Sequence, residues 1–197
     1  MPKETFHNLS ANKKQKIFDA AVQEFSTQRF SEASINQIVK TAEIPRGSFY
    51  QYFHDKEDLF QYMFDQILKE KREIISQIKT LNPDTDVFEV CIQTVKATFA
   101  WSKLKPKYSQ ISLLMEIDQS EFITKIRKAS AQSLKELVER DKKRGIIRPE
   151  IDADLLVEMI YALILKEYFW SGLDEDRFLT KLNDMVAILK RGSAIES

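Results

Sequence analysis

Residues Ser34–Leu59, SINQIVKTAEIPRGSFYQYFHDKEDL, carry the pattern that decides the fold of this 197-residue chain. The stretch opens on a capping box, in which Ser34 is the N-cap and Gln37 stands three positions later. Apolar residues then recur at i, i+3, i+4 and i+7, namely Ile35, Ile38, Val39 and Ala42. This spacing predicts a short helix with one apolar face.

A second short helix is expected directly after the first. Glu43 and Ile44 form a tight break, and Pro45 suits the first position of a new helix because its missing N–H costs nothing there. Phe49 and Phe53 stand four residues apart and therefore share one side of that helix. Two short helices joined by about three residues are the layout of a helix-turn-helix.

Toward the N-terminus, a helix is expected over about residues 12–28, with Asn12 as its N-cap. Lys13, Lys14 and Lys16 crowd the start of this helix, where the helix dipole disfavours cations. These lysines therefore need a compensating partner. DNA phosphate and simple solvation are equal alternatives from this segment alone.

Toward the C-terminus, Asp55 is a candidate N-cap for a long helix that ends near Leu81–Asp84. Gly145 fits a C-terminal cap and Asp152 an N-cap. Further helices are expected at about residues 86–103, 107–117, 120–144, 152–171 and 175–190. The chain has only four glycines and five prolines, and 43% of its residues are apolar. We therefore expect an all-α protein with an ample core.

The motif in Ser34–Leu59 resembles the signature of the TetR family of transcriptional regulators. In that family a capped helix with paired aliphatic residues precedes a Gly-Ser/Thr-aromatic-Tyr-x-x-Phe helix, here Gly47–Phe53. A Lys-Glu-x-Leu segment, here Lys56–Leu59, then starts the next helix. The resemblance covers roughly the first third of the chain. It implies a three-helix DNA-binding domain with a helix-turn-helix at residues 1–60, and a C-terminal helical ligand-binding and dimerisation bundle at residues 61–197.

The residue types of the second short helix suit the major groove of DNA. Gly47 and Ser48 permit close approach of the backbone, Gln51 can read base edges, and Arg46 can reach guanine or phosphate. Lys56 resembles the phosphate-contacting lysine of the family. The residues expected to contact DNA are Lys13, Ser34, Asn36, Arg46, Gly47, Ser48, Tyr50, Gln51, Tyr52 and Lys56.

Two features weaken the argument from this segment. Tyr50 and Tyr52 can donate to phosphates, but both could instead be half-buried core aromatics, with about even weight for Tyr50 and less for Tyr52. The chain has 30 basic and 30 acidic residues and thus no net charge to announce a nucleic-acid partner. The DNA-binding hypothesis therefore depends on motif and placement.

The C-terminal part has more aromatic and methionine side chains than a tight bundle requires, which predicts a cavity for an apolar ligand. Plain core packing is the alternative for each of them. The expected lining residues are Phe88, Cys91, Val95, Phe99, Tyr108, Met115, Phe122, Tyr161, Tyr168 and Phe169. The single cysteine, Cys91, lies in an apolar helical pattern and is interpreted as a small buried hydrophobe rather than a redox sensor.

The resemblance also implies that the last two helices pair with their copies in a second chain. Apolar stripes near the C-terminus would otherwise face water. The residues expected at this dimer interface are Leu156, Met159, Ile160, Leu163, Phe178, Leu182, Met185 and Leu189.

Other classes of protein are disfavoured. Residues Met1–Ser10 lack the apolar run of a signal peptide, and no segment approaches the roughly 20 apolar residues of a membrane span, so a cytoplasmic location is expected. One cysteine and two histidines, His7 and His54, leave no convincing metal site, and no cofactor is expected. Phosphate loops, nucleophile elbows and HExxH motifs are lacking, which favours a binding protein over an enzyme.

The sequence thus predicts a repressor that binds double-stranded operator DNA as a homodimer and is released by a small hydrophobic or amphipathic effector. Two alternatives remain open. One is a helical interaction module of the same fold without DNA binding, and the other is a repressor controlled by a protein partner. A gel shift with the DNA upstream of the gene distinguishes the repressor from the module without DNA binding. Addition of lipophilic ligands distinguishes a ligand-controlled repressor from one controlled by a protein partner.

Overall fold

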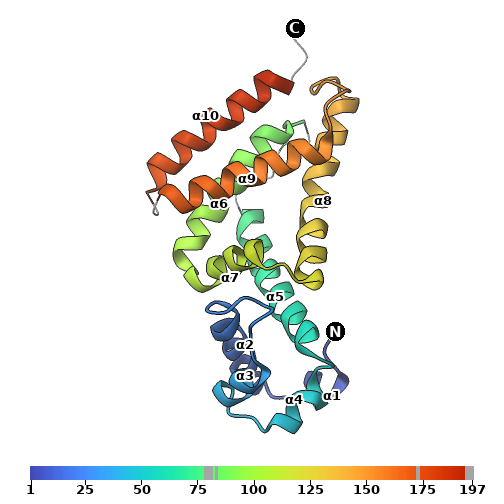
Figure 1. Cartoon of the computed structure of the whole chain (residues 1–197), viewed down its shortest axis with the longest axis vertical. Helices are drawn as coiled ribbons and strands as arrows, with labels where there is room; N and C mark the ends of the chain where they lie inside the picture. The colour runs from blue at the N-terminus through green and yellow to red at the C-terminus, as the bar shows by residue number, and fades with distance from the viewer. Residues whose placement is uncertain (78–81, 83, 172–173, 194–197) are drawn as a thin grey trace. The chain divides into compact units, whose positions relative to one another are not determined.

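A computed structural model describes residues 1–77, 82, 84–171 and 174–193, with side chains described except at 74–77, 169–171 and 193. Its regular elements are α-helices, which confirms the all-α expectation (Figure 1). In chain order they are α1 (Glu4–His7), α2 (Ala11–Phe25), α3 (Ile35–Thr41), α4 (Arg46–Tyr52), α5 (Lys56–Gln77), α6 (Val87–Leu104), α7 (Pro106–Ile117), α8 (Glu121–Lys143), α9 (Ala153–Ser171) and α10 (Glu175–Ser193).

The helices form two compact units. Unit 1 consists of Met1–Ile74 and Trp101–Arg127, and unit 2 of Ile75–Ala100 and Lys128–Ser197. Helices α5, α6 and α8 contribute residues to both units. These units are groups of packed residues, and the functional division between residues 1–60 and 61–197 stays a prediction.

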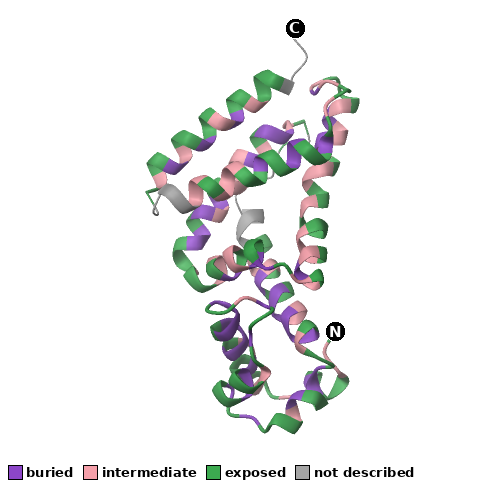
Figure 2. Cartoon of the chain, in the orientation of Figure 1, coloured by how far each residue is buried: buried purple, intermediate pink, exposed green. Residues whose placement is uncertain are grey.

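The core of unit 1 is aromatic. The rings of Phe25, Phe30 and Phe60 lie with centroids 4.9 to 6.1 Å apart, and Phe122 adds a fourth ring 4.8 Å from Phe30. Buried positions follow one side of α2 and of the first turns of α5 (Figure 2). Such offset and edge-to-face pairs add specific geometry to the hydrophobic burial, which fixes short helices that could not stand alone.

The core of unit 2 is mainly aliphatic. Helices α9 and α10 lie side by side (Figure 1) and bury Val157, Ile160, Leu182 and Val186 together with Val87 of α6. Phe99 adds an aromatic contact, because its ring stacks on Phe178 with centroids 4.7 Å apart. Long amphipathic helices thus bury their stripes against one another.

Several expected helix ends are confirmed. Asp55 Oδ1 accepts a hydrogen bond from Asp58 N at 2.8 Å, and Asp152 Oδ1 accepts one from Leu155 N at 3.0 Å, as N-caps do. Gly145 has a φ of 70°, the left-handed conformation expected after a helix C-terminus. The expected end of the long helix near Leu81 lies outside the described residues.

Other helix ends differ from the expectation. The N-cap of α2 is Ser10, whose side chain accepts from Lys13 N, and not Asn12. Pro45 is the N-cap residue of α4 rather than its first helical residue, and the side chain of Ser34 makes no capping hydrogen bond to α3. The short helix α1 was not expected, because four residues are too few to show a periodic pattern.

Candidate nucleic-acid interface

The turn between α3 and α4 closes with a Schellman motif. Glu43 has a φ of 55°, Glu43 N donates to Lys40 O at 3.2 Å, and Ile44 N donates to Val39 O at 3.0 Å. The side chain of Ile44 is buried after this turn. The left-handed residue reverses the chain in the shortest space, and therefore fixes the direction in which α4 leaves α3.

Helix α4 has one buried and one exposed face. Phe49 is 1% exposed and Tyr52 6%, and Phe53, directly after the helix, is fully buried. Arg46, Gly47, Tyr50 and Gln51 are exposed and Ser48 is half-buried. A helix held by aromatic anchors on one side, with short and polar residues on the other, can enter a major groove without disturbing the core.

Helix α3 contributes a second row of exposed polar residues. Ser34 and Asn36 are exposed, as expected from the sequence. The backbone N–H of Ser34 is bound by Glu24 Oε1 at 2.8 Å, so that Glu24 of α2 takes the part expected of Gln37 in the capping box. Lys40 is also exposed and was missed, although its i+4 spacing from Asn36 places it on the same face.

The burial of the two tyrosines of α4 is the reverse of what the sequence favoured, since Tyr52 and not Tyr50 is the core aromatic. The ring of Tyr52 lies in the core, 6.3 Å from the ring of Phe6, whereas Tyr50 is 43% exposed. Lys13 Nζ lies 5.5 Å from the centre of the Tyr52 ring. Tyr52 therefore anchors α4 and Tyr50 is the tyrosine that solvent, or DNA, can reach.

The lysines at the start of α2 have partners within the chain. Lys14 Nζ donates to His7 O at 2.7 Å, and Lys16 Nζ pairs with Glu43 Oε2 at 2.6 Å. The hydrogen bond from Lys16 lowers the pKa of Glu43. Two of the three lysines at the start of α2 are therefore compensated by groups of unit 1, and do not need a DNA phosphate for this purpose.

Lys56 lies under the loop before α3. Its ammonium donates to Ala33 O at 2.9 Å and to Ser31 O at 3.4 Å, and it stands 4.7 Å from the centre of the Phe30 ring. Burial lowers the pKa of Lys56. The ammonium has three N–H donors, so that one remains for a phosphate beside these two carbonyls.

Asp118, which is fully buried between α7 and α8, binds the hydrogen-bond donors of the same loop. Asp118 Oδ2 accepts from Ser31 N at 2.8 Å and from Ser31 Oγ at 2.9 Å, and Oδ1 accepts from Ser120 N at 2.8 Å. Burial alone would raise the pKa of Asp118, but the hydrogen bonds from Ser120 and Ser31 lower it to about 2. The carboxylate therefore stays ionised and ties this loop to the α7–α8 connection within unit 1.

The residues expected to line one ligand cavity fall into separate groups. Tyr108, Met115 and Phe122 belong to unit 1, and Met115 is buried in its core. Most of the others lie in or against the core of unit 2, namely Phe88, Cys91, Val95, Phe99 and Tyr168. Tyr161 is exposed, and the side chain of Phe169 lies outside the described part. Burial raises the pKa of the Cys91 thiol to about 11, in agreement with a packing role.

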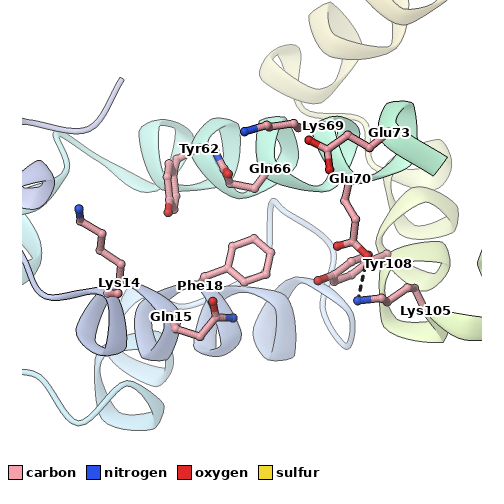
Figure 3. A pocket seen from close by; sticks show the side chains of 11 residues that line it. Lys14, Gln15, Phe18, Tyr62, Gln66, Lys69, Glu70, Glu73, Lys105 and Tyr108 are labelled. Carbon is pink, nitrogen blue, oxygen red and sulfur yellow. Dashed lines mark ion pairs between the residues drawn. The ribbon is translucent and has the colours of Figure 1, made fainter. Parts of the chain in front are cut away.

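An open groove of about 500 Å³ lies in unit 1 between α2, α5 and the start of α7 (Figure 3). Phe18 and Tyr62 supply apolar surface, and Lys105 pairs with Glu70 at 2.9 Å across it. Of the residues that the sequence suggested for a pocket, Tyr108 lines this groove. The groove was missed because its polar lining interrupts each apolar stripe.

The expected dimer stripes are partly internal. Leu156, Ile160, Phe178 and Leu182 are at most 4% exposed in the chain's own core, which corrects their assignment to a surface. Leu163, Met185 and Leu189 are half-buried and Met159 is 43% exposed. Leu155, 56% exposed, and Ile188, 69% exposed, are apolar residues of the same helices that the sequence did not single out. Periodicity shows that a helix has an apolar face but not which neighbour covers it.

The part of the chain that the structure describes contains neither a helix suited to cross a membrane nor a cluster suited to a metal ion. None of its helices combines the length and the apolar character that a membrane crossing requires. The same residues contain no cluster of three histidine, cysteine or carboxylate side chains placed to hold a metal ion.

Known proteins with similar sequences and similar folds support this architecture. The family model for bacterial regulatory proteins of the tetR family matches residues 17–63, which include α3 and α4. The regulator AcrR of Shigella flexneri is 30% identical over 177 residues, which cover 83% of this chain and 77% of AcrR.

Solved structures share the fold over nearly the whole chain. A TetR family regulator from Chloroflexus aurantiacus is 27% identical with a TM-score of 0.68, and the match covers 100% of both chains. FadR of Bacillus subtilis, solved in complex with stearoyl-CoA, is 19% identical with a TM-score of 0.67 over 91% of this chain and 98% of FadR, which shows the fold alone. The resemblance seen in Ser34–Leu59 is therefore confirmed, and the chain belongs to the TetR family of helix-turn-helix transcriptional regulators.

Proposed function

We propose that this regulator is a cytoplasmic repressor that reads its operator with the exposed face of α4. The observation that carries the proposal is Gly47, which is exposed in a short helix although an added Cβ there would meet no atom within 4 Å. None of the residues that the structure describes requires glycine at this position, since an added Cβ would clash with none of them. Close approach of a DNA backbone or base edge is a reason to keep it.

The neighbours of Gly47 supply the readout. Gln51 can bind adenine through two hydrogen bonds, and Arg46 can bind guanine or phosphate. Ser34, which precedes α3, and Asn36 and Lys40 of α3 can contact the flanking phosphates. Because occupancy of a promoter by such a protein is enough to exclude other proteins, repression needs no further activity, and the proposal includes no catalysis.

A binding experiment tests this function. A duplex is selected from a random library with the full-length protein, and its affinity is compared with that of a scrambled duplex. We expect Gln51→Ala to reduce the preference for the selected duplex by about 5- to 150-fold, since a good side-chain-to-base pair discriminates by about 1 to 3 kcal/mol. Gln28→Ala, an exposed glutamine after α2, is the matched control. Unchanged preference in Gln51→Ala would overturn the role of α4 in reading bases.

We propose further that the protein acts as a homodimer with two α4 helices about 34 to 36 Å apart, one turn of DNA. The support is the exposed apolar surface on α9 and α10, chiefly Leu155, Met159 and Ile188. Leu155→Arg with Ile188→Arg should give a folded monomer in sedimentation, because both side chains lie outside the core. A variant that stays dimeric would place the interface elsewhere.

A lipophilic effector completes the proposal, with unit 2 as its binding region. Its support is the group of aromatic and cysteine side chains in or against the core of unit 2, namely Phe88, Cys91, Phe99 and Tyr168, together with the precedent of a protein of like fold solved with stearoyl-CoA. Typical coupling of 1 to 3 kcal/mol predicts about a 5- to 150-fold loss of operator affinity, and operator DNA must weaken ligand binding equally. Calorimetry with a long-chain acyl-CoA on free and DNA-bound protein measures both. Equal affinity in the two forms would rule out induction by this probe.

A further inference from the structure

The C-terminal turn of α4 obtains its hydrogen bonds from the N-terminal segment of the chain. Phe53 N donates to Phe49 O at 2.8 Å, and the carbonyls of the last three helical residues then lie beyond the helix's own ladder. Lys3 N donates to Tyr52 O at 2.8 Å and Lys3 Nζ donates to Tyr50 O at 2.8 Å. Thr5 Oγ1 donates to Gln51 O. Two residues therefore bind all three carbonyls.

The N-terminal segment is itself firmly anchored. Phe6 of α1 is 1% exposed, and its ring lies 4.9 Å from the rings of both Phe53 and Tyr62. The carbonyl of His7 accepts from Lys14 Nζ of α2 at 2.7 Å. Helix α1 therefore lies against α4 (Figure 1), and the contacts of Phe6 and His7 hold the segment that carries Lys3 and Thr5.

We propose that Lys3 and Thr5 are positioning residues for operator recognition, which hold Tyr50 and Gln51 in the orientation that meets the bases. The inference rests on the proposed function of α4. A seven-residue helix is too short to be stable on its own, so its last turn depends on outside partners. The Lys3 ammonium also meets the negative end of the helix dipole, where a cation stabilises the helix.

A competing role for Lys3 is direct contact with a DNA phosphate. Positioning and phosphate contact predict different results, because a phosphate contact acts on every DNA sequence and contributes about one unit to the salt dependence of binding. Positioning acts through Gln51 and Tyr50. Its loss should therefore weaken binding of the selected duplex and leave binding of the scrambled duplex unchanged.

Hydrogen exchange tests the cap without any DNA. The variants are Lys3→Met, which keeps the backbone bond to Tyr52, Thr5→Val, which keeps the shape of Thr5, and Lys3→Arg as the conservative rescue. We expect about five- to ten-fold faster exchange in peptides covering α4 for the first two, from the loss of one hydrogen bond each, and near wild-type rates for Lys3→Arg. Peptides covering α3, and the control Lys128→Met at an exposed lysine of α8, should not change. Unchanged exchange in α4 would overturn the proposal.

DNA binding then tests the consequence, with the selected duplex and its scrambled counterpart. We expect Lys3→Met and Thr5→Val to weaken the selected duplex about five- to ten-fold, with the scrambled duplex and the salt slope unchanged. Equal loss on both duplexes with a salt slope lower by about one would assign Lys3 to a phosphate and overturn positioning. If Lys3→Met fails to fold, Thr5→Val decides alone. A wild-type protein that selects no duplex refutes the proposed function, while the exchange rates still decide the cap.

Discussion

Each of the two units fixes a loop that precedes a helix with a buried carboxylate and at least one cationic side chain. The units differ in whether the carboxylate and the cation also pair with each other. In unit 1 Asp118 accepts from Ser31 N and Lys56 donates to Ala33 O, and in unit 2 Asp141 accepts from Val87 N at 2.6 Å. The carbonyls before Val87 are bound by Arg140, to Thr85 O at 2.7 Å, and by Arg144, to Asp84 O at 2.6 Å. Each loop therefore has a fully buried carboxylate on an N–H and a cation on its carbonyls.

The difference lies in how the charges meet. Asp141 Oδ1 contacts Arg140 Nε at 2.8 Å and Arg144 Nη1 at 3.0 Å; Asp141 and Arg140 belong to α8, and Arg144 directly follows its last residue. Asp118 lies between α7 and α8, whereas Lys56 is the first residue of α5, and no direct ion pair joins the two among the described residues. Unit 2 thus binds its loop from one continuous stretch, Arg140–Arg144, whereas unit 1 binds the loop before α3 from two segments that are far apart in the sequence. In unit 1, either contact can therefore be removed without the other.

The largest effect is expected from Asp141→Ala. The change removes the acceptor of Val87 N and the anion beside two arginines, but those arginines are about a third exposed and regain solvent. We therefore expect a loss of about 3 kcal/mol in the free energy of unfolding, near the lower limit for breaking a buried pair. Urea unfolding measures it. Asp154→Ala, at an exposed ion pair with Lys135, should cost less than about 1 kcal/mol, and an equal loss in both variants would refute the special role of Asp141.

Asp118→Asn should show a smaller effect with a distinct pH dependence. The folded-state pKa of Asp118, about 2, lies below the ordinary value of 3.8, so that its stabilisation is present above pH about 4 and is lost as the pH falls toward 2. We expect the variant to be about 2 kcal/mol less stable near neutral pH. That difference should shrink by about 1 kcal/mol between about pH 5 and about pH 3. A difference independent of pH in urea titrations would contradict this account.

Lys56→Ala tests whether the second contact on the loop also serves DNA. A phosphate contact predicts weaker binding to all sequences and a salt slope lower by about one. The matched control is Lys128→Ala, at an exposed lysine of α8. Fluorescence anisotropy at several salt concentrations gives the slope. If Lys56→Ala lowers stability and leaves the slope unchanged, its role is to bind Ser31 and Ala33 only.

The smallest effect is expected from Glu43→Gly in the turn between α3 and α4. Glycine relieves the left-handed backbone at φ 55° by about 1 kcal/mol, while the solvent-screened pair of Glu43 with Lys16 contributes less than this strain. We expect a net change within about 1 kcal/mol, on the stabilising side. Thermal unfolding measures the change, and Glu43→Ala, which loses the pair but keeps the strain, should be less stable than Glu43→Gly.

The sequence predicted the helix-turn-helix well because its signals are local. The fixed spacing of Gly47, Phe49 and Phe53 decides which side of α4 is buried, and the structure agrees. The contacts of Lys3 and Thr5 with α4 span more than 40 residues and leave no pattern in the chain. The same limit explains the dimer stripes, since the apolar periodicity of α9 and α10 is equally consistent with an internal and an external partner, and Leu156 and Leu182 proved internal.

The buried thiol of Cys91 gives the protein an internal reporter. Cys91 is the only cysteine of the chain, it is 5% exposed, and its pKa of about 11 leaves almost no thiolate at neutral pH. A thiol reagent can therefore modify Cys91 only when unit 2 opens locally, so that the labelling rate reports how often unit 2 opens. Any compound that binds unit 2 and slows this labelling identifies itself without a radiolabel, an operator or an engineered probe.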